Sequence, residues 1–66
     1  MSEQLDDIRS RLETISEELA DLALVHLREA VDAGEDGAGA AATERRLTRA
    51  RRSIDKAAAV LGGDTS

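Results

Sequence analysis

The chain has 66 residues, enough for one small domain, and contains no cysteine, proline or aromatic residue, with one histidine and one methionine. This composition excludes a disulfide framework, a thiolate metal site and a cysteine nucleophile, and it provides no aromatic side chains on which single-stranded nucleic acid could stack. The formal net charge is −5, and the abundance of alanine, leucine and arginine favours helices.

The first predicted element is a long helix over about residues 3–33, where no glycine or proline interrupts the chain. Ser2 is placed to cap its start. Large aliphatic residues recur at alternating intervals of three and four, which is typical of helices that pack against one another. These residues are Leu5, Ile8, Leu12, Ile15, Leu19 and Leu22.

A glycine-rich segment at about 34–39 predicts a turn. A second helix is expected over about 40–61, capped at its start by Asp36 or Thr43 and followed at Gly62 by a short tail, 62–66. The same alternating spacing continues through this helix, at Ala40, Thr43, Leu47, Ala50, Ile54, Ala57 and Leu61.

A turn this short makes the two helices antiparallel. The predicted fold is therefore all-α, a two-helix hairpin forming a single domain over 1–66. Leu47 is expected near residues 22–26, and Ile54 near residues 15–19. Ala50 and Ala57 are expected in the seam between the helices, where small side chains let the two axes approach closely.

One hairpin leaves apolar surface of the first helix uncovered. Past Leu19 the apolar arc widens to about 200°, which is more than one neighbouring helix covers. A chain this small also needs stabilisation beyond its own core. We therefore expect a homodimer of hairpins, a four-helix bundle, with a bundle formed with a different protein as the alternative. The expected dimer interface comprises Leu22, Leu24, His26, Leu27 and Val31.

Charge is unevenly divided between the helices. Residues 2–33 carry nine acids and three arginines (−6), whereas residues 40–61 carry two acids and six bases (+4). Arg46 and Arg51 are expected to reach carboxylates of the first helix and so to favour the antiparallel pairing. Four other cations share one outward face of the second helix, Arg45, Arg49, Arg52 and Lys56. This basic ridge is interpreted as a solvated face; contact with phosphates or with an acidic protein is the alternative.

His26 is the only conventional general base, and it continues the apolar row with Glu29 one turn later. A single polar residue in such a row typically fixes register. The His-x-x-Glu order, without further inward acids, argues against the di-metal sites of helix bundles. We predict no metal, no cofactor and no catalytic residue, and the protein is not expected to be an enzyme.

Two blocks flank the turn, an acidic one, ISEELADLA (15–23), and a basic one, ERRLTRARR (44–52). In these blocks the sequence resembles short Arg/Ala-rich bacterial helical-hairpin proteins of no assigned function, over about residues 5–61. The resemblance implies a hairpin but no activity and no site residues. In architecture alone the chain is also similar to the plasmid RNA-binding protein Rop, a dimer of hairpins, whose aromatic contribution to RNA contact has no counterpart here.

The sequence thus predicts a non-enzymatic structural or interaction protein, a homodimeric hairpin that presents charged helix faces to a protein partner. The alternative is a small nucleic-acid-associated regulator that binds phosphates through the basic ridge. The acidic start differs from a signal peptide, and the longest aliphatic patch, 22–25, is too short to cross a bilayer. We therefore expect a cytoplasmic protein with no membrane contact.

Overall fold

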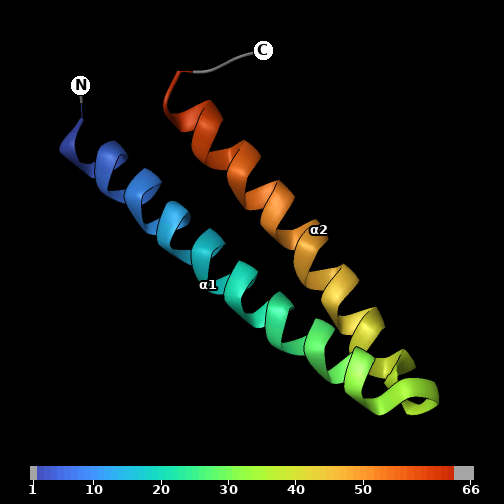
Figure 1. Ribbon diagram of the computed structural model, residues 1–66. Coiled ribbons are helices and arrows are strands. Elements are labelled where there is room, and N and C mark those ends of the chain that lie inside the picture. Colours follow the sequence, from blue (N-terminus) through green and yellow to red (C-terminus); the bar gives the residue numbers. More distant parts are fainter. Residues whose placement is uncertain (1, 64–66) are drawn as a thin grey trace.

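The computed structural model describes residues 2–63. It contains a long helix α1 (Glu3–Ala33), a 3-10 turn η1 (Gly34–Gly37) and a second helix α2 (Ala38–Leu61). The helices lie side by side and run in opposite directions, with η1 at one end of the molecule and Ser2 and Gly63 at the other (Figure 1). The fold is all-α and hairpin-like.

One side chain determines where α1 begins, and one glycine determines where it ends. The Ser2 hydroxyl accepts a hydrogen bond from the Leu5 backbone N–H at 3.3 Å, which confirms the predicted cap and satisfies a donor that the helix leaves free. At the other end Gly34 adopts φ +59°, and its N–H donates to the Val31 carbonyl. A left-handed backbone suits glycine because it has no Cβ, so α1 stops there.

The start of α2 differs from the prediction, since neither Asp36 nor Thr43 caps it. The helix begins at Ala38, Gly37 precedes it with ψ near 0°, and no side chain accepts a capping hydrogen bond there. A side-chain cap needs extended backbone at the capping residue, and the helical turn η1 provides none. Thr43 instead donates its hydroxyl proton to the Gly39 carbonyl at 3.1 Å.

The end of α2 lies where the sequence places it, and the glycine after Gly62 makes a left-handed turn. The Gly62 N–H donates to the carbonyls of Ala58 and Ala59, at 3.0 and 3.1 Å, with φ at −81°. Gly63 is the residue with positive φ, +90°. Of the predicted tail, residues 64–66 lie outside the described residues.

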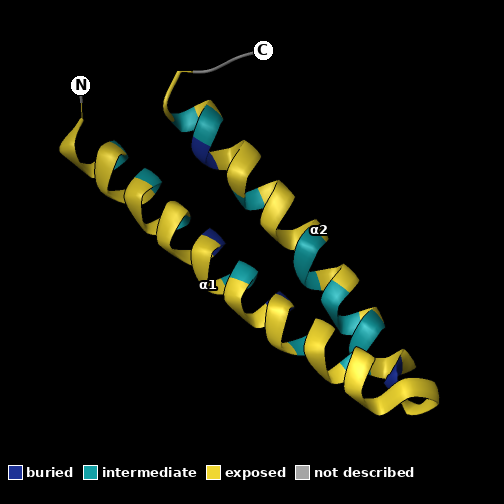
Figure 2. Ribbon diagram, in the orientation of Figure 1, coloured by how far each residue is buried: buried dark blue, intermediate teal, exposed yellow. Residues whose placement is uncertain are grey.

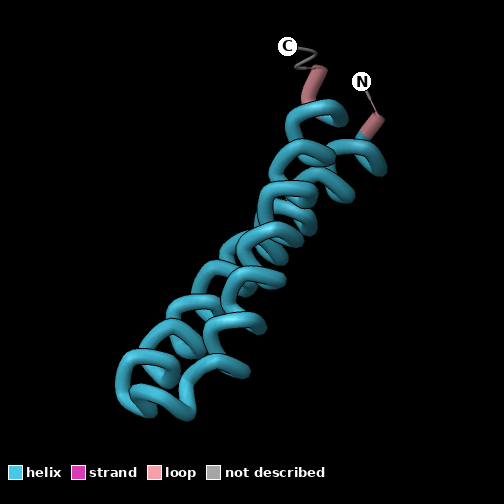
Figure 3. The backbone as a smooth tube through the Cα atoms, turned by 90° about the vertical axis from the view of Figure 1, so that its right-hand side faces the viewer, coloured by secondary structure: helices cyan, strands magenta, loops and turns pink. Residues whose placement is uncertain are grey.

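The molecule is one helix thick. Its Cα atoms extend 51 × 20 × 11 Å, and Figure 3 shows the two helical tubes following each other along the full length. The radius of gyration is 14.9 Å, against about 11 Å for a compact domain of this length. Four residues of the described chain are buried, all of them small, and no large side chain among the described residues is fully buried. The buried residues are Ser16, Ala23, Gly37 and Ala58. Most of the ribbon is coloured as exposed or intermediate (Figure 2).

A central row of residues on each helix faces the other helix, and every member is half-buried. On α1 the row is Leu5, Leu12, Leu19 and His26; on α2 it is Ala40, Leu47, Ile54 and Leu61. These residues belong to the predicted seam, so the sequence correctly identified the middle of the contact.

The flanks of the contact differ from the prediction. One flank, which we call the closed side, is formed by Arg9, Ser16, Ala23 and Ala30 of α1 with Glu44, Arg51 and Ala58 of α2. The predicted flank, which we call the open face, is formed by Ile8, Ile15 and Leu22 of α1 with Thr43, Ala50 and Ala57 of α2. All of these open-face residues are exposed except Thr43, which is half-buried.

The expectation that Ala50 and Ala57 lie in the seam is therefore wrong, since Ala58 takes that role at 8% exposure. The physical reason is side-chain size. Ser16 and Ala23 of α1 are also small, and they meet Ala58's side of α2 closely, whereas the Ile8–Ile15–Leu22 row would hold the axes further apart. The α1 helix is therefore rotated so that Ser16 and Ala23 point toward α2. The rotation of α2 follows from the bonds that Arg51 and Asp55 make to Ser16.

Candidate interaction surfaces

The closed side is held by a polar cluster near the middle of the hairpin. Ser16, 5% exposed, donates its hydroxyl proton to Asp55 Oδ1 and accepts a hydrogen bond from Arg51 Nε at 3.2 Å. Arg51 Nε also lies 4.0 Å from Asp55 Oδ2. The buried hydroxyl is thereby satisfied as both donor and acceptor, which removes the cost of burying it.

The cluster also fixes the register of the hairpin. Ser16 meets Asp55, and Arg9 lies against Gly62, where a Cβ would come within 2.7 Å of Arg9 Nη1. Ile54 therefore lies level with the 15–19 segment, as predicted. The ion pairs found within residues 2–63 all join residues of the same helix, Arg9–Glu13, Arg11–Asp7 and Arg51–Asp55, and the contact between His26 and Glu29 also lies within one helix. The expected reach of Arg51 to a carboxylate of α1 is replaced by its bond to Ser16.

The open face consists of one row of α1 and one row of α2, and both rows lie on the same side of the hairpin. Ser16 of α1 and Arg51 of α2 contact each other, so the closed sides of the two helices coincide. The residues on the opposite flank of each central row must then share the other side. There Ile8, Ile15 and Leu22 are 41%, 42% and 45% exposed. A shallow groove on this side is lined by Thr43, Arg46, Leu47 and Ala50.

A second apolar strip on α1 consists of Leu24, Leu27 and Val31, exposed by 46%, 47% and 73%. It lies beyond the closed side, because the four-residue step from Ala23 to Leu27 turns about 40° further round the helix. The expected interface residues therefore do not form one surface. Leu22 belongs to the open face, His26 to the central row, and the other three to this strip.

Sequence reasoning did not assign Ile8 and Ile15 to an exposed surface. The periodicity predicts that both lie in the contact with the second helix, because large aliphatic residues typically fill such a seam. The signal that could have separated them is the parallel row of small residues one position later, Ser16 and Ala23, which allows closer helix packing.

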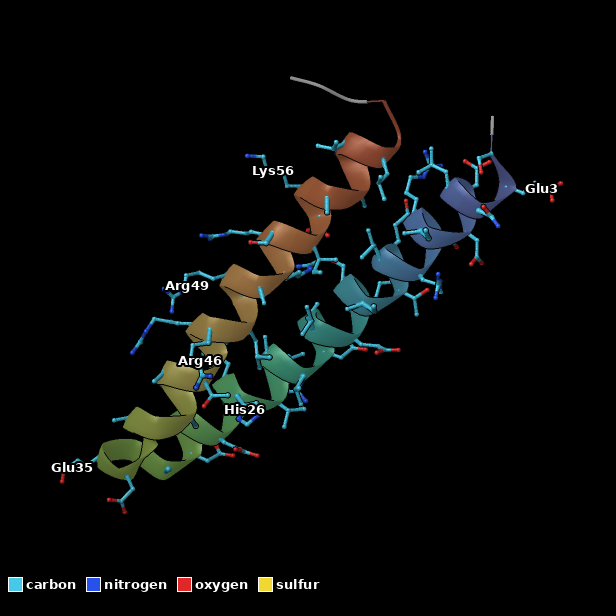
Figure 4. All side chains as sticks on the ribbon, turned by 180° about the vertical axis from the view of Figure 1, so that it is seen from behind. Glu3, His26, Glu35, Arg46, Arg49 and Lys56 are labelled. Atoms are coloured by element: carbon cyan, nitrogen blue, oxygen red, sulfur yellow. The ribbon has the colours of Figure 1, made fainter. Side chains whose placement is uncertain are left out.

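The basic ridge projects outward from α2. All four residues, Arg45, Arg49, Arg52 and Lys56, are exposed, and Arg49 and Lys56 point away from α1 (Figure 4). Three of the arginines surround a shallow depression that Glu44 and Thr48 also line. The Thr48 hydroxyl donates to Glu44 Oε1 at 2.7 Å. Within residues 2–63, none of the four ridge cations forms an ion pair.

His26 lies in the central row near the turn, with 27% of its side chain exposed. Its Nδ1 is 3.5 Å from Glu29 Oε2, but this contact lacks hydrogen-bond geometry, so the buried Nδ1 atom has no hydrogen-bond partner. Among the described residues, no three histidine or acidic side chains are grouped as a metal ion would require.

No protein-family model matches the chain, and comparisons with curated proteins and with solved structures give no match either. The resemblance to Arg/Ala-rich hairpin proteins stays a hypothesis from the sequence. Neither α1 nor α2, as far as the chain is described, has a stretch long and apolar enough to span a bilayer.

Proposed function

We propose that this chain is a non-enzymatic interaction protein that self-associates through its open face into a four-helix bundle and presents its charged outer faces to a protein partner. The observation that carries the proposal is the exposure of Ile8, Ile15 and Leu22 beside Ala50 and Ala57. Two helices contribute to this apolar face, and it runs along most of the hairpin's length.

The exposed area supports self-association. The hairpin exposes 5038 Å², whereas a compact monomer of its mass, 7.0 kDa, exposes about 4,000 Å². The difference is similar to the area that each partner buries in a standard protein interface, about 800 Å². Covering the open face with a second copy would bring the molecule to the exposure of an ordinary domain.

The open face is favoured over the Leu24–Leu27–Val31 strip as the dimer interface. The strip covers only the last turns of α1 before η1, and the α2 surface next to it carries the polar residues of the arginine-lined depression. The open face is longer and includes small residues of α2 that allow close packing. Leu22 and His26 of the expected interface would be covered in this arrangement.

The test is the mass of the chain in solution, measured by light scattering after size exclusion. We expect the wild type to have a mass in solution that is twice the 7.0 kDa mass of the chain. Ile15→Glu should dissociate the dimer, because it places a charge in the apolar interface. The matched control is Thr14→Glu, which adds the same charge on the exposed outer face and should leave the dimer intact.

Leu27→Glu distinguishes the two apolar surfaces. We expect it to keep the dimer mass, because Leu27 lies beyond the closed side. Dissociation by Leu27→Glu combined with a stable Ile15→Glu dimer would assign the interface to the Leu24–Leu27–Val31 strip. A folded wild-type monomer at high micromolar concentration would refute self-association altogether.

A nucleic-acid role through the basic ridge is the second candidate, and the depression between Arg45, Arg49 and Arg52 favours it. Phosphate binding would make the affinity fall steeply between 50 and 200 mM salt and disappear when the ridge residues are changed to alanine. Failure to retain any RNA or duplex DNA at 50 mM salt would exclude it and leave the protein partner as the function of the ridge.

A further inference from the structure

We infer that the second copy docks with both turns at the same end of the bundle, so that α1 of each chain packs on α2 of the other. This inference rests on the proposed dimer. Two open faces can be stacked by a two-fold axis in two ways. If the axis runs along the bundle, α1 faces the partner's α2; if it crosses the bundle, α1 faces the partner's α1 and the turns lie at opposite ends.

Side-chain size favours the first arrangement. The α1 half of the open face carries large residues, Ile8, Ile15 and Leu22, whereas the α2 half carries Ala50 and Ala57. Stacking α1 on the partner's α2 places Ile15 against Ala57 and Leu22 against Ala50, at one uniform helix separation. Stacking like on like would crowd three large residues against three along α1 and bring alanine to alanine along α2, which needs two different separations.

Charge favours the same arrangement. The α1 segment carries −6 over residues 2–33 and the α2 segment +4 over residues 40–61. With both turns at one end each acidic helix lies along a basic one, and with the turns at opposite ends acidic lies along acidic. The net charge of −5 per chain is the same in both arrangements. The two therefore differ electrostatically only in which helices lie next to each other.

The groove on α2 gives the arrangement a local contact. It is lined by Thr43, Arg46, Leu47 and Ala50, and in the hairpin register its level is that of Leu22. In the same-end arrangement the partner's Leu22 enters this groove, and the partner's Glu29 lies one turn away, within reach of the Arg46 guanidinium.

The opposite-end arrangement replaces this attraction with repulsion. Glu29 lies near the turn end of α1, and the antiparallel pairing of α1 with the partner's α1 brings it beside the partner's first turns. Those turns carry Glu3, Asp6 and Asp7. These acids do not belong to the open-face row of α1, so they act on Glu29 only through the acidic charge of that helix end, which is unfavourable. The basic side chains of α2 are then on the other half of the bundle.

The test uses spin labels on the 66-residue chain, which has no cysteine of its own. A label at Glu35→Cys lies in η1, at one tip of the molecule. We expect an inter-chain distance of about 20–30 Å, since neighbouring axes in a bundle lie about 8–10 Å apart and the labels extend outward. Opposite-end docking would give a distance comparable to the 51 Å length of the hairpin and would overturn the inference while leaving the dimer.

A label at Glu17→Cys separates failure of the arrangement from failure of the dimer. Glu17 is exposed and lies near the middle of α1, so its inter-chain distance is short in either arrangement. Absence of any dipolar coupling at both Glu17→Cys and Glu35→Cys means that no dimer forms, which refutes the proposed self-association and the inference with it.

Charge reversal provides a second readout that does not depend on labels. Glu29→Arg and Arg46→Glu should each weaken the dimer several-fold, and the double variant should recover most of that loss. An Arg45→Glu variant, which changes the outward ridge instead, is the control and should leave the dimer affinity unchanged. Additive losses in the double variant would contradict a contact between Glu29 and Arg46 of neighbouring chains.

Discussion

Gly37 marks the closest approach of the turn to α1. A Cβ at this position would overlap the carbonyl oxygen of Ala30 and lie 2.8 Å from its Cα, and both atoms are backbone that cannot move aside. Gly39 lies two residues later, in the first turn of α2, and a Cβ added there would have no atom within 4 Å apart from those of its own turn of helix. The two glycines therefore have different reasons to be present.

Their substitutions should have opposite effects. We expect Gly37→Ala to lower the free energy of unfolding by about 1–3 kcal/mol, as overpacking does. Gly39→Ala should raise it by about 0.5–1 kcal/mol, because alanine is the better helix former. Urea denaturation followed by circular dichroism, at one protein concentration for all variants, measures both. Equal tolerance of the two changes would mean that η1 does not pack on Ala30.

The Ser16 hydroxyl is the only buried polar side chain in the described residues, and its two bonds cross between the helices. Ser16→Ala should cost about 1 kcal/mol, the usual net value of such a bond. Thr14→Ala is the control, since the Thr14 hydroxyl bonds only within α1, at an exposed site. Combining Ser16→Ala with Asp55→Ala should cost less than the sum of the separate losses, because both remove the same contact.

At the scale of the helices, the rotation of each about its own axis decides which residues meet. Arg51, Ala58 and the serine–alanine side of α1 form the closed side, and the open-face row of Ile8, Ile15 and Leu22 is turned outward. This distribution suits an element of a larger bundle, in which each helix has one neighbour at close range and another across an apolar face.

The small residues of the closed side should tolerate enlargement poorly. Ala58→Leu is expected to lower the free energy of unfolding by about 1–3 kcal/mol, since the extra atoms have no space between the helices. Ala42→Leu, at an exposed position of the same helix, should change it little. Thermal denaturation compares the two, and a harmless Ala58→Leu would show that the helices do not approach closely there.

For the whole molecule, the thin shape makes stability depend on concentration. Folding and self-association are coupled if the open face is covered only in the dimer, so dilution should destabilise the chain. For a dimer of this size we expect the Tm to fall by about 5 °C for each ten-fold dilution. A Tm independent of concentration between micromolar and millimolar protein would show that the hairpin is stable alone.

The two helices, the turn and the level at which the helices face each other can all be predicted from local features of the sequence. Glycines end the helices, the Ser2 hydroxyl begins α1, and the alternating spacing marks the central rows of Leu12 and Ile54. These are local features, and a short turn between long helices leaves only one way for the chain to return.

Which flank of the central rows is closed depends on how the two helices pack against each other. The central row of α1 has a neighbouring row on either side, one containing Ile15 and the other Ser16. Periodicity alone predicts that the more apolar of these two rows contacts α2. Close packing favours the row with the smaller side chains, because helices gain contact area as their axes approach. That choice turned Ile8, Ile15 and Leu22 outward and created the surface on which the proposed function depends.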